Sequence, residues 1–146
     1  MERRIFIKNT CLACIGGGAS SLLLQSCNSW HYVISPIENS RLFIKKAEFT
    51  YLKKEKPMIR QWILVKNEKM PFPIAVFRHS ENEYSATYLE CSHQGCEVEP
   101  EGEHLQCPCH GSEFSNRGKL QHGPAERDLK TFKVFNEEDN IQILLP

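Results

Sequence analysis

Two short segments of the chain combine cysteine and histidine at a spacing that suits a metal centre. Cys91 and His93 lie two positions apart in the first, Cys107 and His110 lie three positions apart in the second, and thirteen residues separate the two pairs. Two thiolates and two imidazoles match a [2Fe-2S] cluster in which two cysteines bind one iron and two histidines bind the other. On a tight loop, each segment would give one ligand to each iron.

A structural zinc ion is the alternative, because two cysteines and two histidines also form a familiar zinc set. Zinc sites usually place both cysteines in one segment and both histidines in another. Here each segment holds one cysteine and one histidine. The pattern therefore favours the iron–sulfur centre over a zinc-stabilised binding module without redox activity.

The two segments resemble those of Rieske iron–sulfur proteins, in the disulfide-containing branch found in cytochrome bc-type quinol oxidoreductases. The resemblance covers residues 91–125. It implies one Rieske-type [2Fe-2S] cluster, with Cys91 and Cys107 on the inner iron and His93 and His110 on the outer iron.

The same resemblance implies roles for residues around the cluster. The remaining pair, Cys96 and Cys109, matches the disulfide that ties the two loops together in that branch. Ser112 matches a serine whose hydroxyl donates a hydrogen bond to a bridging sulfide. Phe114 stands where the members of highest potential carry a tyrosine that is hydrogen-bonded to a ligand sulfur, and a phenyl ring cannot donate such a bond. The segment 123–125, Gly-Pro-Ala, resembles the proline loop that covers the cluster.

The N-terminus resembles a twin-arginine export signal. Arg3 and Arg4 are followed by Phe6 and Lys8, and residues 11–24 are apolar and small. Fourteen residues are too few for a membrane span, which needs about twenty. A removable signal read by an export receptor fits better than an anchor.

The end of this leader resembles a bacterial lipobox, because Leu24 lies three positions before Cys27 and a serine directly precedes it. We therefore expect Cys27 to be lipidated and to begin the mature chain. A plain signal with an incidental cysteine and an uncleaved anchor are the alternatives. Cys11 and Cys14 lie inside the leader and are interpreted as small apolar residues without a redox role.

These patterns predict three parts of the chain: a leader over 1–26, a lipid-anchored tether over 27–40 and a Rieske domain over 41–146, with a cluster-binding lobe at about 90–122. A structural disulfide indicates an oxidising compartment such as the periplasm. The 146 residues carry 18 basic and 18 acidic side chains. No basic stripe is present, so nucleic acid is not an expected partner.

The sequence after the leader predicts an all-β fold. Short runs rich in Ile, Val, Phe and Tyr alternate with charged turn clusters, and no helical period is visible. We expect an antiparallel β-sandwich or small open barrel with the cluster lobe inserted into it. The predicted strands are 41–46, 61–65, 74–78, 84–89, 130–135 and 141–145, with short strands at 104–107 and 113–115 in the lobe.

The aromatic residues of these strands are predicted to lie in the core; they are Trp62, Phe77, Tyr88, Phe132 and Phe135. Four other histidines have no partner at metal-ligand spacing and are interpreted as surface or loop residues: His31, His79, His104 and His122.

The expected function is one-electron transfer, with no catalytic residue of the chain's own and oxidoreductase activity only within a complex. Its redox partners would be cytochrome b- or c-type proteins and quinol in a bc-like complex at the periplasmic side of the bacterial inner membrane. The alternative is the small subunit of a periplasmic molybdenum oxidase such as arsenite oxidase, with a molybdopterin subunit as partner. An oxygenase is not expected, because such enzymes add a second domain with mononuclear iron and too few residues remain here for one.

Overall fold

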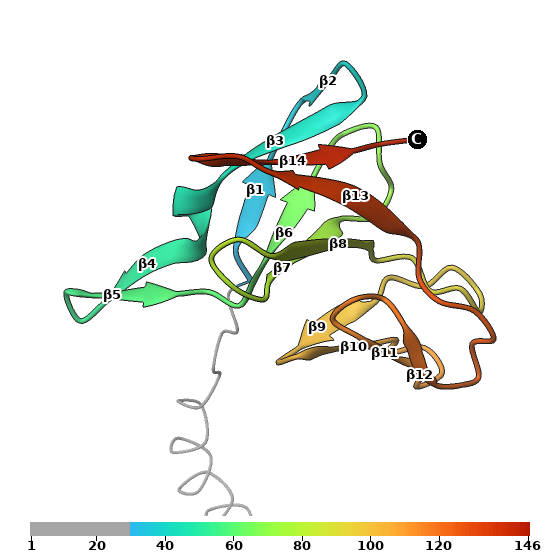
Figure 1. Ribbon diagram of the computed structural model, residues 1–146. Coiled ribbons are helices and arrows are strands. Elements are labelled where there is room, and N and C mark those ends of the chain that lie inside the picture. Colours follow the sequence, from blue (N-terminus) through green and yellow to red (C-terminus); the bar gives the residue numbers. More distant parts are fainter. Residues whose placement is uncertain (1–29) are drawn as a thin grey trace, which may run out of the picture.

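The computed structural model describes residues 30–146 (Figure 1). The predicted export signal and Cys11, Cys14 and Cys27 lie outside the described residues. The described part contains a 3₁₀ helix, η1 (Lys46–Phe49), and no α-helix. None of its helices has the length and apolar character to span a membrane. Its strands are β1 (Tyr32–Ile34), β2 (Ile37–Glu38), β3 (Arg41–Lys45), β4 (Thr50–Lys53), β5 (Lys56–Ile59), β6 (Trp62–Lys66), β7 (Ile74–Arg78), β8 (Tyr84–Tyr88), β9 (Glu99–Glu101), β10 (His104–Gln106), β11 (Glu113–Ser115), β12 (Leu120–His122), β13 (Thr131–Asn136) and β14 (Asn140–Leu144).

Eight strands form one curled sheet in the order β1-β6-β7-β8-β13-β14-β3-β2. Its two halves face each other and enclose a core of side chains from β3, β6, β7, β8 and β14 (Figure 1). The predicted all-β fold is confirmed. One ladder differs from the expected antiparallel pattern, because the short strand β1 pairs in parallel with β6 at the sheet edge.

Strands β6 and β7 are buried on both faces, which explains their continuous apolar sequences. Ile63 and Val76 point into the core between the two halves of the curled sheet. Their neighbours Leu64 and Phe77 point the opposite way, into a second core shared with the cluster lobe. Successive side chains on a strand alternate between faces, so these two strands hold the sandwich and the lobe together.

The lobe is a separate four-stranded antiparallel sheet in the order β12-β11-β10-β9, and Figure 1 shows it below the curled sheet. Both lobe strands predicted from the sequence are present, as β10 and β11. The flanking strands β9 and β12 are three residues each and were not predicted. Pro100 within β9 and the polar sequence of β12 conceal the alternation that usually indicates a strand.

The expected aromatic core is confirmed in part. Phe77 and Tyr88 are buried, and Trp62 and Phe132 are partly buried against the two cores. Phe135 is half-buried instead, and the guanidinium carbon of Arg41 lies 5.0 Å from its ring centroid. A cation above a ring face is stabilising at a surface position, so this phenylalanine contributes outside the apolar core.

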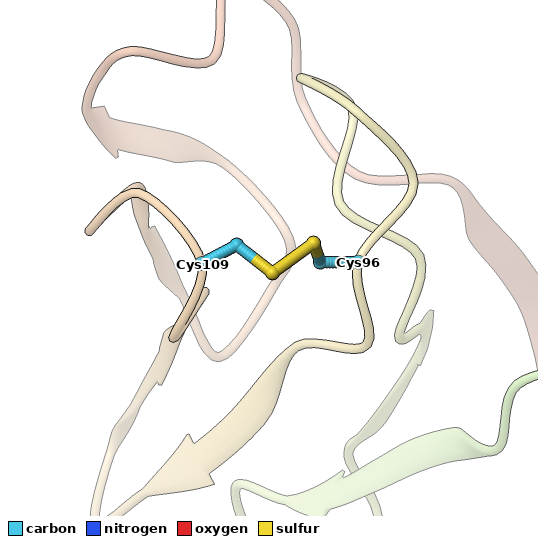
Figure 2. Close-up of a disulfide and its surroundings, with 2 residues drawn as sticks. All are labelled: Cys96 and Cys109. Carbon is cyan, nitrogen blue, oxygen red and sulfur yellow. A yellow bond between two sulfur atoms is a disulfide. The ribbon is translucent and has the colours of Figure 1, made fainter.

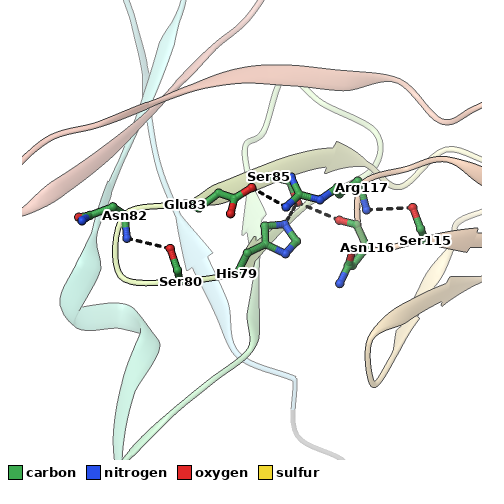
Figure 3. Close-up of polar contacts among 8 residues, drawn as sticks. All are labelled: His79, Ser80, Asn82, Glu83, Ser85, Ser115, Asn116 and Arg117. Atoms are coloured by element: carbon green, nitrogen blue, oxygen red, sulfur yellow. Dashed lines mark hydrogen bonds and ion pairs between the residues drawn. The ribbon is translucent and has the colours of Figure 1, made fainter.

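A set of polar contacts fixes the turn between β11 and β12 to the curled sheet (Figure 3). The hydroxyl of Ser85 donates to the carbonyl oxygen of Asn116 at 2.8 Å, and Nε2 of His79 lies 2.8 Å from the same hydroxyl oxygen. Because Ser85 has one proton to donate, His79 acts as the donor to it. Burial, followed by the charge of Arg117, lowers the pKa of His79. Arg117 also pairs with Glu83. The β11–β12 turn is therefore attached both to strand β8 and to the turn between β7 and β8.

Candidate metal centre

The two cysteine–histidine segments fold into six-residue loops of the same backbone shape. Residues 91–96 are closed by the bridge between Glu90 and Glu97, and residues 107–112 by the pair Gln106 and Glu113. In each loop the first N–H donates to the last carbonyl at 2.8 Å, and the fifth N–H donates back to the first carbonyl. The sequence therefore builds one structural unit twice.

Glycine occupies the fifth position of each loop because the backbone there is left-handed. Gly95 has φ 71° and Gly111 has φ 78°. A side chain is strained in this region, whereas glycine enters it freely. These two residues turn the chain so that the preceding side chains of each loop face the other loop.

The disulfide between Cys96 and Cys109 joins the two loops (Figure 2). It links the last position of the first loop to the third position of the second. Its presence agrees with the pairing that the family resemblance implied.

The remaining cysteines of the lobe, Cys91 and Cys107, are free and buried, and their side chains are in hydrogen-bonding contact. Burial, and then this contact, raise the pKa of the Cys107 thiol. The backbone N–H groups of Cys109 and His110 act in the opposite direction. Two adjacent buried thiols become thiolates readily only when a cation shares the site, which is the condition that metal binding supplies.

The rings of the two predicted histidine ligands lie against each other. The ring centroids of His93 and His110 are 4.9 Å apart and the rings are nearly perpendicular. Nδ1 of His93 is buried and has no hydrogen-bond partner among residues 30–146. An orphaned buried nitrogen is costly in a native fold, and a metal ion bound there would remove that cost. His93 is half-buried and His110 is exposed, so the imidazoles lie nearer to solvent than the thiols.

The segment 123–127 covers the loops and contacts both of them. The backbone N–H of Ala125 donates to the hydroxyl of Ser112 at 2.9 Å, and the hydroxyl of Ser92 donates to the carbonyl of Arg127 at 2.6 Å. The peptide bond between Gly123 and Pro124 is cis. Ser112 is fully buried and uses its oxygen as acceptor, so its own O–H proton is free for a further acceptor.

Sequence reasoning did not identify two residues that position this segment. Ser92 lies inside the first motif, and a small hydroxyl side chain in such a loop is the signal that would have indicated a backbone contact. Asp128 accepts from Nζ of Lys119 at 2.8 Å and from the backbone N–H of Leu120 at 2.9 Å. The Lys119 contact, followed by the Leu120 N–H, lowers the pKa of Asp128. No local pattern in the sequence points to that bridge.

The family model of the Rieske [2Fe-2S] domain matches residues 49–133, which is more than half of the chain. The chain belongs to this family. Its cofactor is therefore a [2Fe-2S] cluster of the Rieske type, and the zinc alternative is set aside. The residues fit this group, because two buried free thiols and two adjacent imidazoles on matched loops form the donor set that such a cluster takes.

Relatives with established names agree with this membership. Iron-sulfur subunit 2 of the cytochrome b6-f complex from Nostoc sp. (strain PCC 7120) is 42% identical over 55 residues, which cover 36% of this chain and 31% of that one. The putative Rieske protein YhfW of Bacillus subtilis is 52% identical over 42 residues, covering 27% of this chain and 8% of that one. The chain thus matches about a third of the cytochrome b6-f subunit and a smaller share of YhfW.

A solved structure extends the likeness to the fold. The plasma membrane Rieske protein PetC3 from Synechocystis PCC 6803 superposes with a TM-score of 0.50 and 32% identity, covering 57% of this chain and 85% of that one. The predicted Rieske fold is confirmed by this likeness together with the family match.

Ser112→Ala is expected to lower the midpoint potential of this Rieske protein. The free hydroxyl proton of Ser112 would stabilise the electron-rich reduced state, and a hydrogen bond to a charged group is worth about 1.5–3 kcal/mol. Since 59 mV corresponds to a tenfold change for one electron, the fall would be roughly 60 mV or more. Protein-film voltammetry measures it. Ser115→Ala, whose hydroxyl oxygen accepts backbone N–H groups of the next turn, is the control; equal potentials in both variants would contradict this role.

Phe114→Tyr is expected to raise the potential by a similar amount, roughly 60 mV. Phe114 is fully buried in the same core as Cys91 and Cys107, and the family resemblance implies that a tyrosine at this position donates to a ligand sulfur. Phe77→Tyr is the matched control, because Phe77 is buried in the same core and is not implicated by the resemblance. A rise in both variants, or in neither, in the same voltammetric assay would remove this explanation.

Proposed function

We propose that Cys91, Cys107, His93 and His110 hold the cluster, and that the chain transfers single electrons on the quinol side of a bc-like complex. The observation that carries the proposal is the asymmetry of the four side chains. Both thiols are buried in the lobe core, whereas both imidazoles lie toward the surface. Electron exchange with a partner requires one side of a cofactor to be accessible while the other is fixed.

The bound cluster supplies a one-electron couple whose potential exceeds that of all-cysteine clusters, because neutral imidazoles replace two thiolates. The exposed ring of His110 can accept a hydrogen bond from a quinol hydroxyl, and His93 borders a polar depression of about 570 Å³ that Arg127 and Lys130 also line. The hydroxyl of Ser112, whose proton is free, would donate a hydrogen bond to the cluster from its buried side. The disulfide and the segment 123–127 hold both loops in register and exclude water from the thiols.

We also propose the arrangement of the whole chain: an export leader over 1–26, a lipid on Cys27, and a Rieske domain at the periplasmic face of the bacterial inner membrane. The tether expected over 27–40 is shorter than that range, because β1 and β2 within it already pair in the curled sheet. Relatives named as cytochrome b6-f subunits and as a plasma membrane Rieske protein support membrane attachment and a bc-type partner. The disulfide supports an oxidising compartment.

Low-temperature electron paramagnetic resonance of the dithionite-reduced protein tests the electron-transfer part. We expect a rhombic signal and two irons per chain, and quinol should reduce the oxidised protein. Mass spectrometry of the mature N-terminus tests the rest, with a lipidated Cys27 expected. A colourless protein that holds zinc would reject the redox function. An intact leader would reject only the lipid anchor and would leave the redox function standing.

A further inference from the structure

The hairpin of β4 and β5 is a structural feature that the cluster chemistry does not use. It forms a two-stranded sheet of its own and projects from the domain on the left of Figure 1. Residues 52–59 on it are all exposed. An isolated two-stranded hairpin is marginally stable in water, and a hairpin usually needs further packing.

The register of the hairpin separates its side chains into two unlike faces. Thr50 pairs with Ile59 and Leu52 with Pro57, so these four share one face; we call it the apolar face of the hairpin. The opposite face is fixed to the domain by Arg60, which lies 4.4 Å from the centroid of the Tyr51 ring and donates to the Thr50 carbonyl.

The apolar face of the hairpin lies open to solvent. Leu52 is 73% exposed and Ile59 is 56% exposed. An antiparallel pair normally turns its apolar face to a core and its polar face to water. Thr50 and Ile59 at the base of this face border a hollow that Glu81, Glu137 and Glu138 also line. Leu52 and Ile59 nevertheless remain more than half exposed, so they are available to a partner.

The tip of the hairpin is basic. Lys53, Lys54 and Lys56 surround a single acidic residue, Glu55, and all four are exposed. Lys53 pairs with Lys56 on the face opposite Leu52 and Ile59, and Lys54 lies in the turn, so the lysines border the apolar face from its far side and its tip. Apolar side chains beside basic ones are typical of peptide surfaces that bind an anionic lipid interface. Each lysine near such a surface contributes favourable electrostatic energy, which salt screens.

The chain also leaves the described domain beside this hairpin. Trp30, the first described residue, shares a cavity with Tyr51, Ile59 and Arg60. The segment that leads away from the domain therefore starts at the root of the hairpin.

We propose that the β4–β5 hairpin docks on an anionic lipid bilayer, with Leu52 and Ile59 in the interface and the three lysines at the headgroups. This goes beyond the function proposed above, because it adds a membrane contact made by the folded domain and does not depend on a lipid at Cys27. The hairpin projects away from β11 and β12 (Figure 1), so docking leaves that end of the cluster lobe free for a redox partner.

Vesicle flotation of the cluster-loaded mature chain, residues 27–146 carrying Cys27→Ser, tests the proposal, because neither lipidation nor the apolar leader can contribute. The probes are phosphatidylcholine vesicles and vesicles of roughly three parts phosphatidylcholine to one part phosphatidylglycerol. We expect binding to the anionic vesicles to be about tenfold stronger or more, and to weaken as salt is added.

The hairpin variants should lose that preference. Leu52→Ser with Ile59→Ser, and separately Lys53→Gln, Lys54→Gln and Lys56→Gln together, are each expected to reduce anionic binding by about tenfold. Ile34→Ser is the matched control, since Ile34 is 81% exposed on β1, and it should bind unchanged. Visible absorbance per chain confirms the loaded cluster in every variant.

Equal binding to both vesicle types, or equal loss in Ile34→Ser, would overturn the proposal. So would sedimentation showing that the Leu52 and Ile59 substitutions abolish self-association while leaving vesicle binding intact, because the apolar face would then join two copies. If the unsubstituted chain held no cluster, the electron-transfer function would be contradicted. The flotation result would still decide whether the hairpin binds anionic lipid.

Discussion

Alanine in place of His93 or His110 is expected to remove the [2Fe-2S] cluster almost completely. The two rings are the predicted imidazole ligands, and their centroids are 4.9 Å apart. Loss of either ring would leave one iron short of one ligand and would open the site to water. Iron and acid-labile sulfide per chain, with the visible spectrum, measure the outcome. Iron content should fall to near zero.

The lobe offers two matched controls for this experiment. His104 on β10 and His122 on β12 lie on the same small sheet, and each lies 3.6 Å from a glutamate oxygen. Alanine at either position should leave iron and sulfide unchanged. If His104→Ala removed the cluster as fully as His93→Ala, general loss of lobe stability would explain both results, and the ligand assignment would fail.

The strands predicted from the sequence account for six of the eight in the curled sheet, because their side chains carry strong local signals. The short strands β1 and β2 lie in the segment that was predicted to be a tether. The runs Trp62–Val65 and Ile74–Phe77 are apolar throughout. Such continuity indicates burial on both faces, and the structure shows the two cores responsible for it. The pairing of β14 with β3 joins residues about a hundred positions apart, and no local pattern specifies so distant a partner.

The hairpin shows the opposite case. The charged residues 53–57 predicted a solvated turn, but Lys53 and Lys56 pair within the β4–β5 ladder and only Lys54 and Glu55 form the turn. Their side chains are solvated as expected. The backbone pairing was missed because Pro57 and three lysines are unusual strand residues, and here they lie in a hairpin with two open edges.

The site was predictable where chemistry requires particular residue types. Metal ligation requires cysteine and histidine. The left-handed backbone at the fifth position of each six-residue loop requires glycine. The contact of Ser92 with the carbonyl of Arg127, and that of Asp128 with the N–H of Leu120, depend on which loops meet after folding. Such positioning contacts use ordinary polar residues, so the sequence alone does not distinguish them from surface side chains.

Removal of the disulfide is expected to destabilise the lobe more than any single surface substitution. The bridge closes a loop across a sequence separation of 13, and a cross-link over a loop of this length contributes about 3 kcal/mol. For a domain of this size, the midpoint of thermal unfolding would fall by roughly 10–20 °C. Cys96→Ser combined with Cys109→Ser, followed by circular dichroism and cluster absorbance on heating, measures the change.

The single variant Cys96→Ser should be more harmful to the cluster than the double variant. The sulfurs of Cys96, Cys107 and Cys109 all lie within 4.8 Å of one another. With Cys96 replaced, the thiol of Cys109 is freed and lies close enough to compete with Cys107 for iron, because a thiolate binds iron well. The double variant has no thiol at position 109, so this competition is absent. Mixed paramagnetic signals are therefore expected from the single variant and one signal from the double variant. Identical spectra would show that the bridge serves stability alone, whereas a second signal would show that it also protects the choice of ligand.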